Sequence, residues 1–327
     1  MRKRQILALA MVAAMASGMV VSAETEDKRG EGKRFVSITY NSTNTSAITL
    51  NKAAEKVFTE AGAEFTALYY ESNIETMMSM IENAVSSGCD GIILQNNMNL
   101  EAGVDTLKEA LDKGMVIVEY DSDYEQIPKI QYCFLADQYG LGYMIGEMAG
   151  EWANEVLIPA GIKPIAGNFE YRNTPDFVSR TEAIVEGLTN VCPEAEVVRA
   201  EQPSNTSEAM NMTENWMQTY PDMNVLVGVC DSYTMGGAET FKAAGKDPAV
   251  TGCFGADAIP EALEQIAKGS VYKGTVFIDS EKIGTDMAEY MLDYVNDIEV
   301  EGREKYNYFV MEKITTSNID DYYKAEE

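Results

Sequence analysis

The strongest constraint on the fold of this chain is a regular alternation of strand-like and helix-like segments. In residues 35–120, short runs rich in Val, Ile, Phe and Tyr alternate with stretches whose apolar residues recur every three or four positions. The predicted strands cover 35–40, 65–70, 91–94 and 116–120. Sustained alternation of this kind is typical of parallel sheets that are covered by helices on both faces.

The same alternation resumes after residue 130. Further strands are predicted at 130–134, 164–167, 196–198, 225–229, 250–254 and 275–278. Helices are predicted between them at 140–156, 177–189, 208–219, 235–244 and 260–268. So many strands exceed one comfortable sheet and therefore favour two similar lobes. Because no low-complexity linker separates the two halves, we expect the chain to cross between the lobes several times.

The N-terminus has the three parts of a secretory signal peptide. A basic start at residues 2–4 precedes an apolar run at 6–21, and Val21-Ser22-Ala23 fits a small-x-small cleavage site. The alternative is a retained membrane anchor, but the apolar run is shorter than the roughly 20 residues of a membrane span. We expect cleavage near Ala23, a flexible charged leader at 24–34, and a periplasmic or other extracytoplasmic location. No lipidation cysteine follows the apolar run, because the first cysteine is Cys89.

Composition excludes several classes of chemistry. The chain has no histidine, which removes Ser-His-Asp and Cys-His catalysis and every zinc site that needs an imidazole. Its five cysteines contain no CxxC pair, and no metal site or cofactor is expected. The formal net charge of −28 opposes binding to nucleic acids and to anionic membrane surfaces.

Polar residues follow nearly every predicted strand of the chain. In open parallel sheets, ligands bind beyond the carboxyl ends of the strands. The polar clusters are 41–46, 95–97, 121–123, 230–231 and 255–257. Such residues also occur in turns and helix caps, which is the structural alternative for each of them. No GxGxxG or GxxxxGK[ST] motif is present, so Asp, Asn and Arg side chains here favour a neutral polyhydroxylated ligand over a phosphate.

Four segments, 114–123, 177–183, 230–238 and 274–277, carry a resemblance to a known family. In this order they resemble the periplasmic sugar-binding proteins of ABC transporters, of the ribose- and galactose-binding type. The resemblance extends from about Lys33 to Val310. It implies a type I periplasmic-binding-protein fold of class α/β, with two Rossmann-like lobes, parallel sheets and a three-strand hinge. The expected N-terminal lobe is 35–136 plus 279–308, and the expected C-terminal lobe is 137–278 plus 309–327.

The resemblance also implies a set of ligand-binding residues. Asp121 and Asp257 match strand-end aspartates that accept from sugar hydroxyls, and Arg180 matches an arginine that donates from the start of a helix. Together with the strand-end pattern, it gives these candidates: Asn44, Gln95, Asn96, Asp121, Asp176, Arg180, Asp231 and Asp257. Between Gln95 and Asn96 the choice stays open.

The stacking rings that the family places after the first strand and near Thr206 are absent, and Cys230 and Ile278 stand where amides are expected. Other aromatic residues are candidates for stacking on the ligand, with core or rim packing as the alternative: Phe169, Tyr171, Phe177 and Tyr233.

The expected function is that of an exported, monomeric receptor that captures a monosaccharide or similar polyhydroxy ligand and delivers it to a membrane permease. A furanose-like signal is an alternative ligand, and a sensor kinase or chemoreceptor is an alternative partner. A glycoside-cleaving enzyme using Asp121 and Asp257 is a further alternative. A regulator of the lactose-repressor type is disfavoured, because its DNA-binding helices would have to precede Phe35, where the signal peptide lies. We therefore expect no enzymatic activity.

Overall fold

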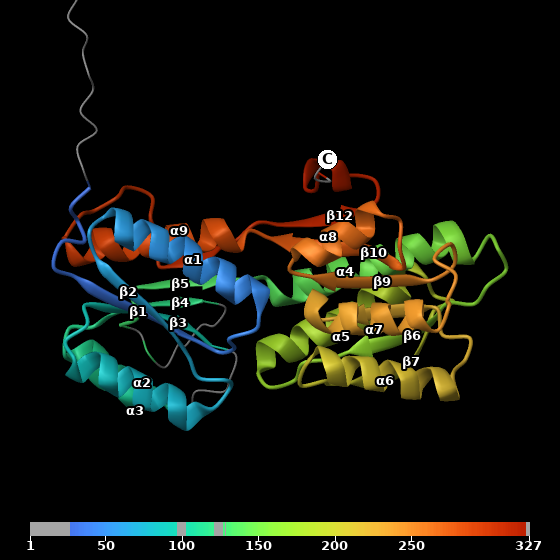
Figure 1. The fold of residues 1–327 in the computed structure, drawn as a ribbon, viewed down its shortest axis with the longest axis horizontal. Helices are drawn as coiled ribbons and strands as arrows, with labels where there is room; N and C mark the ends of the chain where they lie inside the picture. Colours follow the sequence, from blue (N-terminus) through green and yellow to red (C-terminus); the bar gives the residue numbers. More distant parts are fainter. Residues whose placement is uncertain (1–26, 97–102, 121–126, 128, 325–327) are drawn as a thin grey trace, which may run out of the picture.

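The computed structural model describes residues 27–96, 103–120, 127 and 129–324, which form two lobes (Figure 1). The strands of the N-terminal lobe are β1 (Arg34–Thr39), β2 (Glu64–Tyr69), β3 (Gly91–Gln95), β4 (Val116–Tyr120), β5 (Tyr132–Leu135) and β11 (Tyr306–Tyr308). Its helices are α1 (Thr45–Glu60), α2 (Ile74–Ser86), α3 (Val104–Asp112) and α9 (Ser280–Val295). The sheet has the order β11-β5-β4-β3-β1-β2, and all its neighbouring strands are parallel.

The C-terminal lobe repeats this plan. Its strands are β6 (Ile165–Phe169), β7 (Glu196–Glu201), β8 (Val225–Gly228), β9 (Gly252–Ala256), β10 (Tyr272–Ile278) and β12 (Met311–Thr315). Its helices are α4 (Gln138–Trp152), the π-helical η2 (Ala153–Leu157), α5 (Pro175–Val191), α6 (Thr206–Thr219), α7 (Asp231–Ala243), α8 (Pro260–Ala267) and the 3-10 turn η3 (Ile319–Asp321). The order is β12-β10-β9-β8-β6-β7, with only β12 antiparallel to its neighbour. The predicted two-lobed α/β fold is confirmed.

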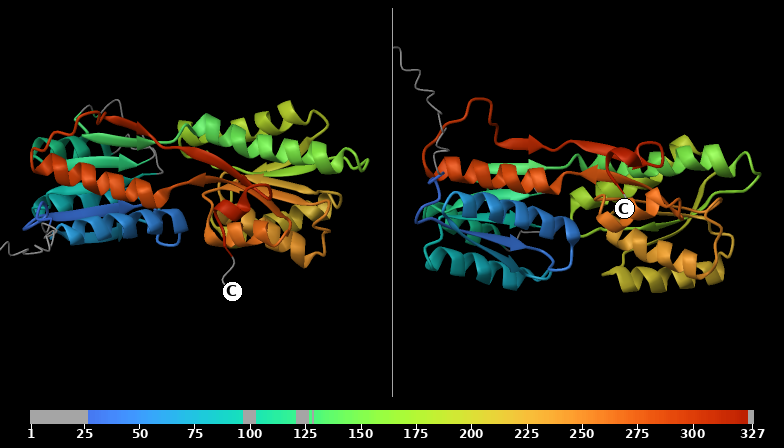
Figure 2. Two further views of the ribbon diagram at one scale, coloured as in Figure 1. Left: turned by 90° about the horizontal axis from the view of Figure 1, so that it is seen from above. Right: turned by 45° about the horizontal axis from the view of Figure 1, so that its top comes forward.

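Three short segments connect the lobes: 136–137 between β5 and α4, 279 between β10 and α9, and 309–310 between β11 and β12. Figure 2 shows all three passing from one lobe to the other. The pairs of described elements that make extensive contact all lie within one lobe. The three crossings are therefore the main connection between the lobes and form a hinge.

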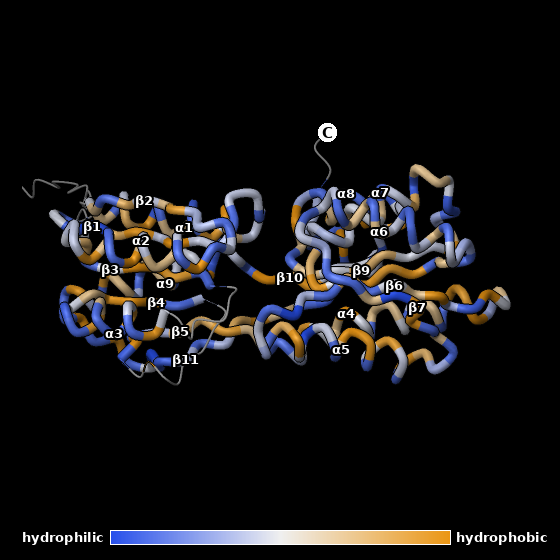
Figure 3. Tube along the Cα trace, turned by 90° about the horizontal axis from the view of Figure 1, so that it is seen from below, coloured by the Kyte–Doolittle hydropathy of each residue, from blue (hydrophilic) through white to orange (hydrophobic). Residues whose placement is uncertain are grey.

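Helices cover both faces of each sheet. Helices α1 and α9 pack together on one face of the N-terminal sheet, and α2 and α3 pack on the other. In the C-terminal lobe, α4 and α5 cover one face, and α6, α7 and α8 cover the other. Because both faces are covered, central strands such as β3 and β4 are buried along their whole length, and Figure 3 shows largely hydrophobic strands inside each lobe. No helix in the described part of the chain is long and apolar enough to span a membrane.

Many polar residues at strand ends serve as helix caps. In six helices a side-chain oxygen of the N-cap residue accepts a hydrogen bond from a backbone N–H of the first turn. These caps are Asn44, Asn73, Asp137, Thr174, Asn205 and Asp279. Capping thus explains part of the polar pattern that the sequence shows after its strands.

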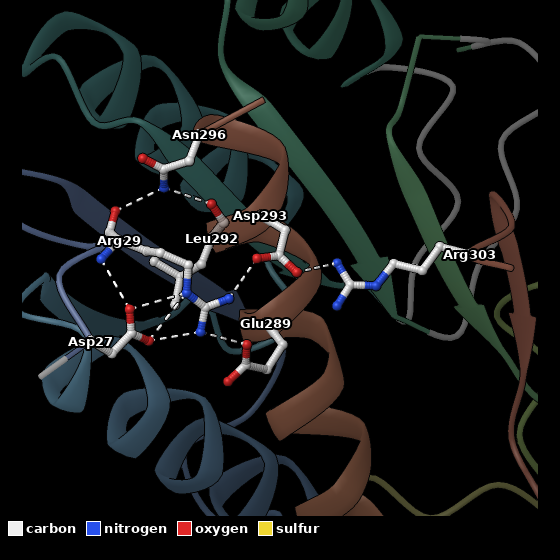
Figure 4. Close-up of polar contacts among 7 residues, drawn as sticks. All are labelled: Asp27, Arg29, Glu289, Leu292, Asp293, Asn296 and Arg303. Carbon is white, nitrogen blue, oxygen red and sulfur yellow. Dashed lines mark hydrogen bonds and ion pairs between the residues drawn. The ribbon is translucent and has the colours of Figure 1, made fainter. Parts of the chain in front are cut away.

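The residues that precede β1 are held against the N-terminal lobe. The Arg29 guanidinium contacts Asp27 at 2.7 Å, Glu289 at 2.8 Å and Asp293 at 2.5 Å (Figure 4). Asp293 also accepts from Arg303 at 2.6 Å, so one carboxylate of α9 joins the start of the fold to the loop before β11. These ion pairs attach Arg29, which lies within the leader expected at 24–34, to α9.

Candidate functional site

A cleft of about 310 Å³ lies between the two lobes, where the carboxyl ends of both sheets face each other. A cavity of this size suits one small molecule. The hinge residue Phe309 and Ile278, the last residue of β10, line it. The other lining residues lie at or after strand ends, or near the starts of α1, α5, α6 and α7. The site is therefore built from segments far apart in the sequence.

Hydroxyl and amide groups dominate the wall contributed by the N-terminal lobe. The lining residues on this side are Tyr40, Asn41, Thr43, Asn44, Ser46, Ser72, Asn96 and Tyr120. The Oδ1 atom of Asn44 accepts from the backbone N–H of Ala47 at 2.9 Å, which caps α1. Asn44 is thus both a cap and a cleft residue, and its NH2 group is the part available to donate to a ligand.

The open choice between Gln95 and Asn96 has a structural answer. Asn96 lines the cleft, and its Oδ1 accepts from the hydroxyl of Tyr70 at 3.3 Å. Gln95 is fully buried beneath it, where its Nε2 donates to Asn51 Oδ1 at 2.6 Å and to the hydroxyls of Ser37 and Thr39 at 3.2 Å. Asn96 therefore faces the cleft, and Gln95 belongs to the hydrogen-bond network that supports it.

Arg180 is fixed at the cleft by α5 and its neighbours. Its side chain is almost completely buried, although the residue lines the cleft. Its Nε donates to Gln138 Oε1 at 2.6 Å, and its Nη1 donates to the carbonyl of Val229 at 3.1 Å. Its Cζ lies 4.7 Å from the centre of the Phe177 ring. These contacts fix the position of the positive charge, which is the arrangement that favours tight recognition of oxygen acceptors.

Asp257 lies in a strained turn at the end of β9. It lines the cleft with φ +104°, and Ala258 follows with φ +49°. A second pair of non-glycine residues with positive φ, Glu71 and Ser72, follows β2, and Ser72 also lines the cleft. Strain of this kind is concentrated at functional sites, so these two turns mark the cleft independently of its shape.

Asp231 lies outside the cleft, unlike its prediction as a ligand-binding residue. Its carboxylate is fully buried and accepts from the hydroxyl of Tyr272 at 2.6 Å, from Thr275 Oγ1 at 2.8 Å and from the N–H of Ile259 at 3.1 Å. Burial, and then the nearby charge of Asp257, raise the pKa of this carboxyl well above its ordinary value. The preceding residue, Cys230, is the one that lines the cleft.

Three of the four aromatic candidates line the cleft: Tyr171, Phe177 and Tyr233. Burial raises the pKa of the Tyr171 and Tyr233 hydroxyls, so both stay neutral and act as donor and acceptor. The fourth candidate, Phe169, is fully buried and stacks on Trp216 with ring centres 5.0 Å apart, which makes it a core residue.

Of the other two predicted carboxylates, one does not line the cleft and one lies outside the described residues. Asp176 is exposed in the first turn of α5 and does not line the cleft. Asp121 lies outside the described residues, as does the expected signal peptide at 1–23. Ligand contact by the candidates that line the cleft stays a prediction.

The cleft also contains residues that the sequence analysis did not name. They include Tyr40, Tyr120, Asn173, Gln202, Ser204, Asn205 and Phe309. Asn173 follows β6, and Gln202 to Asn205 follow β7. The strand-end rule, if applied to the strands ending at Phe169 and Glu201, would have found these residues. The position of Phe309 in the hinge carries no such local signal.

Comparisons with known proteins agree on this architecture. The ABC transporter periplasmic-binding protein YphF of Escherichia coli K12 is 22% identical over 262 residues, which cover 79% of this chain and 75% of that protein. A solute-binding protein of Actinobacillus succinogenes with bound D-allose has a TM-score of 0.78 at 17% identity, covering 89% of this chain and all of that one. A Bacillus halodurans solute-binding protein with bound myo-inositol has a TM-score of 0.74 at 21% identity, covering 90% of this chain and 98% of that one.

The family profile described as a periplasmic binding protein domain matches residues 35–299, which include both sheets up to β10 and the helix that returns to the first lobe. This match, together with two lobes, three crossings and a cleft at the strand ends, assigns the family: the chain belongs to the periplasmic binding proteins.

Proposed function

We propose that this protein is the receptor of an ABC transporter and captures a monosaccharide or a similar small polyol in the cleft between its lobes. The observation that carries the proposal is that both walls of the cleft present side-chain amides and hydroxyls, with Asp257 and Arg180 on the C-terminal side. A sugar hydroxyl both donates and accepts, so it needs acceptors such as Asp257 beside donors such as Arg180.

Aromatic rings complete the match to a sugar. Tyr171 and Phe177 lie edge to face with ring centres 4.9 Å apart, and Tyr233 lines the same wall. At the hinge, Tyr120 and Phe309 stack with ring centres 5.8 Å apart. Such rings cover the apolar C–H faces of a pyranose, a furanose or an inositol while the polar groups bind its rim. The structural relatives with D-allose and myo-inositol support a ligand of this class.

Family membership makes this an exported protein that works with a membrane permease. The proposal extends this to a signal peptide at residues 1–23, cleavage near Ala23, and a monomer that binds no nucleic acid. The strongly negative charge supports the last point, because it repels phosphate backbones.

A thermal-shift screen of the purified protein tests the proposal. The panel contains pentoses, hexoses, polyols, furanose-like signals, amino acids and nucleosides. A ligand at a hundred times its dissociation constant stabilises the folded state by about 2.7 kcal/mol, which raises the melting temperature by several degrees. We expect the largest shift from a sugar or a polyol.

Other outcomes of the screen contradict the proposal in different ways. A shift with nucleosides or amino acids alone keeps the receptor and rejects the sugar. Release of products from glycosides would indicate an enzyme. Absence of any shift, after bound ligand has been removed by unfolding and refolding, would reject small-molecule capture by this cleft.

A further inference from the structure

The turn that carries Asp257 into the cleft needs support from the interior. Asp257 and Ala258 adopt φ values of +104° and +49°, a region that residues with a Cβ atom rarely occupy. Glycine would adopt this backbone at little cost, but glycine offers no carboxylate to a ligand. The chain has kept side chains here, so neighbouring contacts must stabilise the conformation.

The N–H of Asp257 donates to the backbone carbonyl of Val276 at 2.9 Å, and two buried side chains hold the next two residues. The N–H of Ala258 donates to Thr275 Oγ1 at 3.2 Å, and the N–H of Ile259 donates to Asp231 Oδ2 at 3.1 Å. Thr275 Oγ1 in turn donates to Asp231 at 2.8 Å, and Tyr272 donates to the same carboxylate at 2.6 Å. Asp231, Thr275 and Tyr272 are each fully buried.

The glycine at position 255 leaves room for the Asp231 carboxylate. A Cβ atom at Gly255 would lie 2.6 Å from Asp231 Oδ1 and 2.5 Å from the Tyr272 hydroxyl. A buried carboxylate is unfavourable unless several donors satisfy it, and here two hydroxyls and one N–H do so. Burial of the Asp231 carboxyl therefore costs free energy of folding. Its hydrogen bonds connect it to the backbone of the Asp257 turn, directly at Ile259 and through Thr275 at Ala258.

We propose that Asp231 and Thr275 are positioning residues: their hydrogen bonds to the N–H groups of Ile259 and Ala258 hold the turn that presents Asp257 to the ligand. The part of this inference that concerns binding rests on the proposed function. The part that concerns the turn does not, because it depends only on hydrogen bonds within the C-terminal lobe.

The first test needs no ligand. Thr275→Val keeps the shape of the side chain and removes the hydroxyl, Thr275→Ser restores the hydroxyl, and Tyr272→Phe removes a donor to Asp231 that does not reach the turn. Amide hydrogen exchange and HN–Hα couplings are measured by NMR on the whole chain. We expect the Ala258 amide to exchange about tenfold faster in Thr275→Val, with an altered Asp257 coupling, and both to stay near wild type in Thr275→Ser and Tyr272→Phe.

The proposal is overturned if Thr275→Val leaves the Ala258 exchange rate and the Asp257 coupling at their wild-type values. Equal acceleration in Tyr272→Phe would also overturn it, because it would show general loosening of the interior. If Thr275→Val does not fold, Asp231→Asn carries the same test at the Ile259 amide, since it keeps the shape of the side chain and replaces one acceptor oxygen by an NH2 group.

A second test links the turn to binding, with D-allose as the probe. In a double-mutant cycle, Thr275→Val should weaken D-allose binding about tenfold in the wild-type background but less than twofold beside Asp257→Ala. Equal weakening in both backgrounds contradicts positioning through Asp257. If the wild-type protein does not bind D-allose, the result counts against the proposed function for that sugar, and the exchange experiment still decides the role of the turn.

Discussion

Arg180 is the only cationic residue among the described residues that line the cleft, and its guanidinium is already oriented by Gln138 and Val229. We expect Arg180→Ala to weaken binding of the sugar found in the screen by about 2–4 kcal/mol, because charge-assisted hydrogen bonds inside a closed cleft are lost. Isothermal titration calorimetry measures the change directly.

Arg172→Ala is the matched control for Arg180→Ala. Arg172 is exposed and pairs with Glu170 at 2.8 Å outside the cleft. Its removal should leave the affinity unchanged. A folded Arg180→Ala protein with wild-type affinity would show that Arg180 has no part in binding.

Asp231 makes the stability of the protein depend on pH in a direction that can be tested. Burial and the charge of Asp257 raise the pKa of its carboxyl in the folded protein. Asp231 thus contributes stability that is fully present below a pH of about 4 and is lost as the pH rises through its raised pKa. Relative to Asp231→Asn, the wild type should lose up to about 1.4 kcal/mol per pH unit across that window. Urea denaturation at a series of pH values measures this, and a constant difference would contradict it.

At the residue scale, the sequence predicted the type of side chain in the cleft better than the individual contacts. Gln95 is the last residue of β3 and is buried, whereas its neighbour Asn96 lines the cleft. Asp231 is the first residue of α7 and is buried, whereas its neighbour Cys230 lines the cleft. A shift of one residue exchanges the two faces of a strand and turns a side chain at a helix start to another side, and no local pattern in the sequence determined which residue faces the cleft. Phe309 enters the cleft from a hinge segment, so only the tertiary structure reveals it.

The glycines of α4 determine how closely α5, and with it Arg180, approaches. A Cβ atom at Gly146 would lie 2.0 Å from the carbonyl oxygen of Ile184, and one at Gly142 would lie 2.1 Å from that of Arg180. Replacing a solvent-exposed glycine inside a helix by alanine usually stabilises the folded protein by up to about 1 kcal/mol. Here the sign reverses, and we expect Gly146→Ala to destabilise the protein by about 1–3 kcal/mol through overpacking against backbone. Urea denaturation measures the loss.

Glu55→Ala on the exposed face of α1 is the control for Gly146→Ala, and it should change the stability by less than about 0.5 kcal/mol. If Gly146→Ala is as stable as the wild type, the two helices have room to separate. In that case the close packing does not fix the position of α5.

At the element scale, the alternating pattern predicted the strands and helices from β1 to β10 with boundaries shifted by a few residues. The last part of the chain was not predicted in this detail, although α9 carries Ile283, Met287 and Met291 on one buried face. The strands β11 and β12 are short and lie at the edges of two different sheets. Their pairing with β5 and β10 depends on contacts between distant residues, which local periodicity does not report.

At the scale of the whole molecule, the sheets of the two lobes have corresponding strand orders, and the chain crosses between the lobes three times. This arrangement leaves each lobe with its own sheet, and it places the hinge residue Phe309 and the adjoining strand residue Ile278 in the cleft. The number of strands indicated two lobes, and the resemblance indicated the hinge. A rotation about the crossings changes the separation of the walls while the packing inside each lobe is kept, because the extensive contacts between described elements lie within lobes.

Ligand binding should therefore compact the molecule. Asn44 and Asn96 lie on one wall, and Arg180 and Asp257 lie on the other, so a small sugar that binds to both sets links the two lobes. A ligand shifts such an equilibrium by the difference between its affinities for the closed and the open form. Small-angle X-ray scattering at saturating sugar should give a smaller radius of gyration than the free protein, and a compound from the panel that gives no thermal shift should leave it unchanged. An unchanged radius at full saturation would mean that the ligand binds one lobe alone, and the closing receptor would have to be abandoned in favour of a rigid cleft.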